Sequence, residues 1–176
     1  MQTLDTERLT IRLFTEGDAA FILELVNDAD WLRFIGDKNV RSLDDARRYL
    51  RHGPLAMYEQ HGLGLCCVER RSDAAALGMC GLIKRDAQAD IDLGFAYLPA
   101  ARGQGYAREA GAAMLAQGFG PLGLKRIVAI TALDNQASAR VLEALGMHLE
   151  RVIVRGSAPN TQTDRLFAAN AQGWPG

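Results

Sequence analysis

The stretch from Ile91 to Phe119, IDLGFAYLPAARGQGYAREAGAAMLAQGF, has the pattern of a strand, a glycine-rich turn and a helix. In its first part bulky residues alternate with Asp92, Gly94 and Ala96, so one strand face packs and the other leaves room beside a carboxylate. Pro99 ends the strand. Small and apolar residues then recur with the period of a buried helical stripe, at Ala107, Ala110, Gly111, Met114, Leu115 and Gly118.

The turn between strand and helix, Arg102 to Arg108 (RGQGYAR), has the features of an anion site. Glycine lets the backbone approach a ligand closely, and the first turn of a helix offers unpaired N–H groups that carry roughly half a positive charge. A Gly-x-Gly sequence also fits an ordinary tight turn. A dinucleotide fingerprint would need a third glycine at Arg108, and a P-loop would need Gly-Lys-Ser/Thr, which is absent.

A second strand and helix follow. Residues 125–133 (KRIVAITAL) are apolar on both faces, which predicts a strand buried on both sides. The helix after it has Ser138, Val141, Leu142 and Leu145 in register and ends at Gly146. The Ser138 hydroxyl therefore falls on the inward stripe, where it needs either a bond to its own helix backbone or another partner.

The composition indicates one globular domain. The chain has 176 residues, of which 48% are hydrophobic and 23% are charged. A formal net charge of −1 argues against nucleic acid or an anionic membrane as the main partner. No apolar run approaches the ~20 residues of a spanning helix, and residues 1–5 have no signal-peptide pattern. We therefore expect a cytoplasmic protein, a monomer or a homodimer.

The cysteines agree with a reducing compartment. Cys66, Cys67 and Cys80 are odd in number, and the adjacent pair would point to opposite faces of a strand. We expect reduced core thiols. No metal site is expected, because ligand spacings such as Cys-x-x-Cys are missing and the three histidines are scattered.

Three segments carry a resemblance to a known family. Arg102-x-x-Gly105-x-Ala107, between a strand and a helix, resembles the acetyl-coenzyme A motif of the GCN5-related N-acetyltransferase (GNAT) superfamily. Asn135-x-x-Ser138 with residues 145–147 (LGM) resembles its second motif. Residues 6–22 (TERLTIRLFTEGDAAFI) resemble the branch that includes ribosomal-protein N-terminal acetyltransferases. The resemblance implies one α/β (α+β) domain over residues 1–176, with a mixed, mostly antiparallel sheet of about six to seven strands and about four helices.

The resemblance also implies acetyl-coenzyme A (acetyl-CoA) as the cofactor. The turn would hold the pyrophosphate, backbone groups of residues 96–98 would pair with the pantetheine arm, and Asn135 would hold that arm. Arg140 either reaches a phosphate or is a surface arginine. The cofactor candidates are Ala96, Tyr97, Leu98, Arg102, Gly103, Gln104, Gly105, Tyr106, Ala107, Arg108, Asn135, Ser138 and Arg140.

Acyl transfer to an amine needs a base and a partner for the leaving thiolate. Superfamily members place a base carboxylate near Asp92, which we expect to act through water; the alternative is a structural carboxylate paired with an arginine. Many members carry a tyrosine where this chain has Leu142. Ser138 is then the remaining candidate for the thiolate step. Cysteine catalysis lacks support, since no cysteine has a basic neighbour or a helix N-terminus.

The apolar pattern loosens in residues 28–62, and the resemblance implies that this stretch contains two short helices that line the acceptor side of the cleft. Trp31 and Phe34 are expected in a loop, and Ser42 is expected to cap a helix that runs toward Arg51. The candidates for acceptor contacts are Trp31, Phe34, Tyr58 and Glu59, each of which also suits core or lid packing. The acceptor is a small-molecule or peptide amine: a protein N-terminal amine on branch resemblance, with aminoglycosides, polyamines or amino acids as alternatives. A non-catalytic acyl-CoA sensor is the alternative of a different class.

Overall fold

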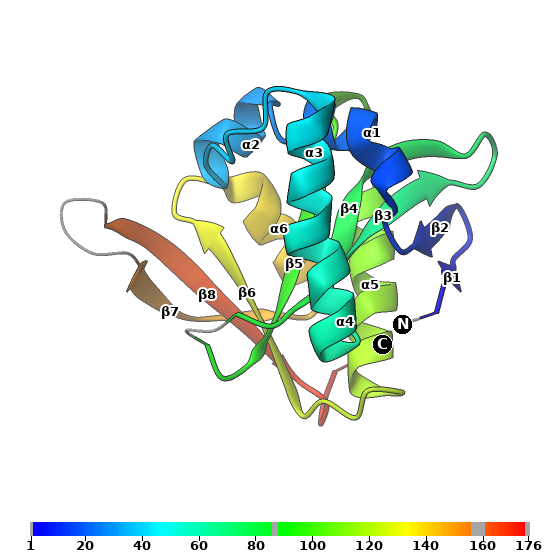
Figure 1. Cartoon of the computed structure of the whole chain (residues 1–176). Helices are drawn as coiled ribbons and strands as arrows, with labels where there is room; N and C mark the ends of the chain where they lie inside the picture. The colour runs from blue at the N-terminus through cyan, green and yellow to red at the C-terminus, as the bar shows by residue number, and fades with distance from the viewer. Residues whose placement is uncertain (1, 86–87, 156–160, 175–176) are drawn as a thin grey trace.

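A computed structural model describes residues 2–85, 88–155 and 161–174. The strands within them are β1 (Leu4–Asp5), β2 (Leu9–Arg12), β3 (Leu65–Arg70), β4 (Ala75–Ile83), β5 (Ile91–Tyr97), β6 (Arg126–Ala132), β7 (His148–Arg155) and β8 (Gln162–Asn170). They form one sheet in the order β1-β2-β3-β4-β5-β6-β8-β7 (Figure 1). The mixed, mostly antiparallel sheet is confirmed, and its eight described strands slightly exceed the six to seven expected.

The described part of the chain has six α-helices where about four were expected. They are α1 (Ala19–Leu25), α2 (Ala29–Phe34), α3 (Leu43–Leu50), α4 (Ala56–His61), α5 (Tyr106–Phe119) and α6 (Gln136–Ala144), with short 3-10 turns η1 (Glu16–Asp18) and η3 (Pro99–Ala101) and a π turn η2 (Arg51–Leu55). The difference lies before β3. The helix expected to run toward Arg51 continues through η2 into α4, so one predicted helix becomes a longer, interrupted segment.

Side-chain caps begin two of the helices, α3 and α2. Ser42 caps α3 as predicted, because its hydroxyl accepts the Asp45 N–H at 3.1 Å. The loop expected around Trp31 and Phe34 is wrong, since both residues lie in α2. Asp28 supplies the missing signal: its carboxylate accepts the N–H groups of Asp30 and Trp31 and begins this helix.

The helices cover both faces of the sheet. The larger core joins α5 and α6 to one face, and a second core joins α1, α2 and α3 to the other, as Figure 1 shows for α5 and α3. Cys66 belongs to the first core and Cys67 to the second, so the prediction that they point to opposite faces is confirmed. No described helix is both long enough and apolar enough to cross a membrane.

The sheet opens between β5 and β6. These strands pair in parallel only at Ile91 with Ile127 and at Asp92 with Val128. Beyond those residues β5 stays paired with β4, and β6 stays paired with β8 along its whole length. The C-terminal parts of β5 and β6 therefore face a gap in the middle of the sheet, where backbone groups can meet a ligand.

Candidate active site

A cavity of about 400 Å³ lies at this gap, within the size range of small-molecule sites. One wall is the end of β5, at Phe95, Ala96 and Tyr97, and the opposite wall is the end of β6, residues 130–132. Further lining comes from the turn before α5, from α2, from the start of α6, from Leu25 of α1 and from Arg155 at the end of β7. We call this space the first cavity.

The turn before α5 has the backbone of an anion site. Gly103 and Gly105 have φ angles of +71° and +82°, a left-handed conformation that glycine adopts without strain. Gly105 is the N-cap residue of the 14-residue helix α5. Gly103, Gly105, Tyr106, Ala107 and Arg108 all line the first cavity. The unpaired N–H groups of the first turn of α5 are therefore available at its wall.

Two arginines fix this turn in place. The Arg102 Nε donates to the Tyr97 carbonyl at 2.9 Å, and its guanidinium pairs with Asp28 and, at 2.6 Å, with Asp30. Arg8 donates from Nη1 to the Gln104 carbonyl at 3.0 Å and pairs through Nε with Glu109 at 2.7 Å. Arg102 thus ties the turn to α2, with its charge already matched by two carboxylates.

A second cavity of about 270 Å³ adjoins the first. Both are lined by Trp31, Ile35, Phe95, Ala96, Ile130 and Ser138, so they meet beside the middle of β5 and the start of α6. Asp92, Arg85 and Lys38 line only the second cavity. A molecule that enters the first cavity can therefore meet one held in the second.

Asp92 is the buried carboxylate of the second cavity. It is 1% exposed; its Oδ2 accepts from Arg85 Nε, while its Oδ1 has no hydrogen-bond partner among the described residues. Burial raises the Asp92 pKa, and the neighbouring Arg85 charge opposes that rise. Asp92 therefore has features of both alternatives: it is paired with an arginine, as a structural carboxylate would be, and it lines a cavity, as a general base must.

The start of α6 lies where the two cavities meet. Asn135 lines the first cavity and caps α6, because its Oδ1 accepts the Ser138 N–H at 3.0 Å. Ser138 lines both cavities, and its hydroxyl makes no hydrogen bond within the described residues, so of the two alternatives the bond to its own helix backbone is not formed. Leu142, at the position where many superfamily members carry a tyrosine, is buried in the larger core and also lines the second cavity.

Most of the expected residues come together, and five do not line either cavity. Leu98 donates its N–H to the Leu77 carbonyl at 2.9 Å, and the Gln104 side chain donates to the Ala100 carbonyl at 2.5 Å. Arg140 and Glu59 are exposed and lie outside both cavities. Of the acceptor candidates, Trp31 and Phe34 line the first cavity.

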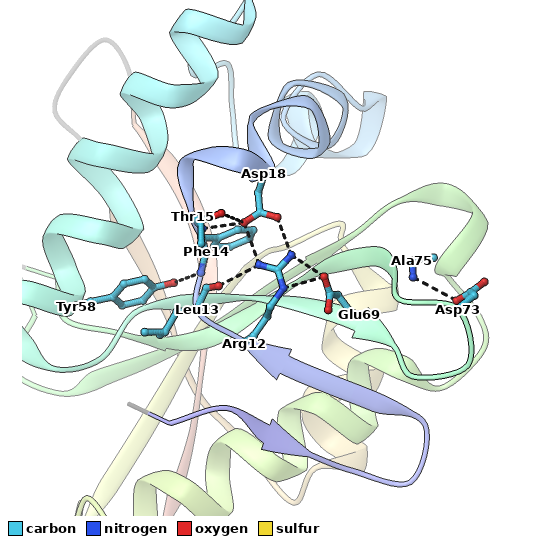
Figure 2. Close-up of polar contacts among 9 residues, drawn as sticks. All are labelled: Arg12, Leu13, Phe14, Thr15, Asp18, Tyr58, Glu69, Asp73 and Ala75. Atoms are coloured by element: carbon cyan, nitrogen blue, oxygen red, sulfur yellow. Dashed lines mark hydrogen bonds and ion pairs between the residues drawn. The ribbon is translucent and has the colours of Figure 1, made fainter.

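Tyr58 is the fifth expected site residue that lines neither cavity, and its hydroxyl has a structural role (Figure 2). It accepts the Phe14 N–H at 3.2 Å and donates to the Leu65 carbonyl, which joins α4 to the chain after β2 and to β3. Burial raises its pKa. Beside it, Figure 2 shows Arg12 between Asp18 and Glu69, an ion-pair group that supports the same corner of the fold.

The cysteines lie away from this chemistry. All three are free and buried, and burial raises the pKa of Cys66 and of Cys67 to about 12 and that of Cys80 further. At neutral pH they are thiols, which are poor nucleophiles.

Sequence reasoning missed several site residues. Arg8, Arg85, Lys38 and Arg155 come from four separate segments, and an arginine or lysine in a polar stretch gives no sign of what it will face. The β6 wall, residues 130–132, could have been found, because a strand buried on both sides next to a splayed neighbour must line the gap between them.

Comparisons with known proteins agree with this geometry. Residues 8–148 match a family model described as "Acetyltransferase (GNAT) domain". The chain belongs to this family. The curated "Uncharacterized N-acetyltransferase YoaA" of Bacillus subtilis (strain 168) is 30% identical over 153 residues, which cover 85% of this chain and 85% of that protein.

Solved structures of acetyltransferases share the fold. An acetyltransferase (GNAT family) from Bacillus anthracis has a TM-score of 0.82 at 24% identity, covering 97% of this chain and 99% of that one. The microcin C7 self-immunity acetyltransferase MccE, whose crystal structure is a complex with acetyl-CoA and AMP, has a TM-score of 0.78 at 16% identity and covers 94% and 93%. At these identities the likeness concerns the fold.

Proposed function

We propose that this GNAT protein moves an acetyl group from acetyl-CoA to a primary amine at the junction of the two cavities. The observation that carries the proposal is the meeting of two cavities with different linings. The first contains the glycine turn and the N-terminus of α5, and the second contains the buried carboxylate of Asp92. Acetyl-CoA would occupy the first cavity and the amine the second.

The residues of the first cavity fit acetyl-CoA. The turn at residues 103–108 offers backbone N–H groups to a pyrophosphate, and a side chain at Gly105 would crowd Arg8 Nη2, 3.3 Å from the added Cβ. The Leu98 N–H is bonded to β4, so strand alternation directs the Tyr97 N–H toward the gap. Tyr97 is thus better placed than Leu98 to pair with the pantetheine arm.

Asp92 and Ser138 have separate tasks in the proposed reaction. The amine nitrogen forms a bond to the thioester carbon, the carbon–sulfur bond breaks, and the electron pair leaves on sulfur. Asp92 accepts the proton that the ammonium loses, directly or through water, since its Oδ1 has no protein partner in the described chain. The nitrogen loses its second proton as the amide forms, and the thiolate takes up one proton to leave as the thiol. The Ser138 hydroxyl at the junction is placed to hydrogen-bond the sulfur.

The direct test measures thiol release from acetyl-CoA with a panel of amines, and identifies the acetylated product by mass. Turnover with any amine supports the proposal. Thermal stabilisation by coenzyme A with no turnover on any amine would instead favour the sensor, which has no use for Asp92. Protein N-terminal amines stay the first acceptors to try, and a cytoplasmic location and a monomeric or homodimeric state stay predictions.

A further inference from the structure

Among the described residues that line the second cavity, Lys38 is the cation without a matching carboxylate. Arg85, in the same lining, pairs with Asp92, and Arg155, in the first cavity, pairs with Asp164 at 2.6 Å. Lys38 makes no ion pair with any described residue. Among the described charges of this wall, one positive charge is therefore in excess.

The environment of Lys38 is electropositive. Partial burial lowers the Lys38 pKa, and the charges of Arg85 and Arg155 lower it further. Lys38 nevertheless stays partly open to solvent, at what we call the outer side of the cavity, whereas Asp92 is 1% exposed. An anion bound beside Lys38 would be attracted by Lys38, Arg85 and Arg155. The charges of the two arginines are partly balanced by their own carboxylate partners, Asp92 and Asp164.

We propose that the acceptor amine carries an anionic group, a carboxylate or a phosphate, which Lys38 binds at the outer side of the second cavity while the amine reaches toward Asp92. The inference rests on the proposed acetyl transfer and names its substrate class. A polyamine or an aminoglycoside would bring further positive charges toward Lys38, Arg85 and Arg155, so these acceptors fit the cavity less well.

The experiment compares kcat/KM for amines in matched pairs that differ in one anionic group. The pairs are an amino acid and its amide, phosphoethanolamine and ethanolamine, and two tripeptides that begin with aspartate and with asparagine. The three pairs separate a free carboxylate, a phosphate and an acidic peptide terminus as sources of the anion. We expect the wild-type enzyme to prefer the anionic member of at least one pair.

Three variants assign the preference to Lys38. We expect Lys38→Met to lower the ratio of kcat/KM, anionic over neutral, by about tenfold, as the loss of one charged contact would. Lys38→Arg should keep most of the ratio. Lys125→Met makes the same chemical change at an exposed lysine outside both cavities and should leave the ratio unchanged.

The outcomes distinguish this inference from the proposed function. Turnover of neutral amines as fast as their anionic partners, or an unchanged ratio in Lys38→Met, would overturn the anionic acceptor and leave acetyl transfer standing. No turnover with any amine, by a protein that still binds coenzyme A, would overturn both. An equal fall in Lys38→Met and Lys125→Met would show a general charge effect and also overturn the assignment.

Discussion

Asp92 can serve as a general base or as the structural partner of Arg85, and the pH dependence of the rate distinguishes these roles. Because burial raises its pKa, the deprotonated base forms at higher pH than for an exposed aspartate, and the rate should rise as pH increases through that raised pKa. If Asp92 is the base, we expect Asp92→Asn to lower turnover about 10²–10⁴-fold, to leave cofactor affinity nearly unchanged and to remove the acidic limb of the rate profile.

The chain contains a matched control for this change. Asp164 is 0% exposed, pairs with Arg155 and also has an Oδ1 without a partner in the described chain, but it lines neither cavity. Asp164→Asn should lower the melting temperature and keep the acidic limb. A folded Asp92→Asn enzyme with near-normal turnover and the wild-type profile would assign Asp92 to structure alone.

A substitution at Gly105 tests whether the turn before α5 binds coenzyme A. Valine there would strain a left-handed backbone and place a branched side chain beside Arg8, so we expect Gly105→Val to weaken coenzyme A binding about tenfold or more. Calorimetric titration of the folded variant measures this. Gly123→Val is the control: it has a φ of +63° and open space around it, away from both cavities, and should cost stability without changing cofactor affinity.

At the scale of one element, Asn135 caps α6 and also lines the first cavity, where we propose that acetyl-CoA binds. Asn135→Ala removes the cap of α6, which costs about 0.5–2 kcal/mol, along with any contact to the pantetheine arm. Asn135→Ser keeps a capping oxygen and removes the amide. We expect Asn135→Ser to raise the apparent KM for acetyl-CoA more than it lowers kcat, with little change in melting temperature. A fall in kcat alone would place Asn135 in the chemistry.

The elements differ in how well the sequence alone predicts them. Periodicity and spacing are local properties, and they correctly predicted β5, the glycine turn, α5, β6 and α6, because each has a clear apolar period and a marked end. They failed around α2, a six-residue helix whose cap, Asp28, precedes no long apolar stripe. The Arg85 partner of Asp92 was also out of reach, because pairs between segments depend on three-dimensional packing.

At the scale of the whole molecule, one core holds both parts of the sheet together. Ile127 is fully buried in that core and lies opposite Ile91, where β5 and β6 still pair. We expect Ile127→Ala to lower the free energy of unfolding by about 2–5 kcal/mol in urea denaturation. Val152→Ala, at a side chain 54% exposed on β7, should change it by less than about 0.5 kcal/mol. Equal losses in the two variants would contradict this account of the core.

The early end of the β5–β6 pairing has a consequence for cooperativity. Strands β1–β5 and β6–β8 share a backbone ladder of only two residue pairs, so each group can open without tearing a long ladder between them. An extended ligand arm bound in this gap would pair with both groups and couple them. We expect amide hydrogen exchange at Tyr97 and along β6 to slow when coenzyme A binds. In this protein the cosubstrate would then also be a mechanical part of the sheet, present only while the enzyme is at work.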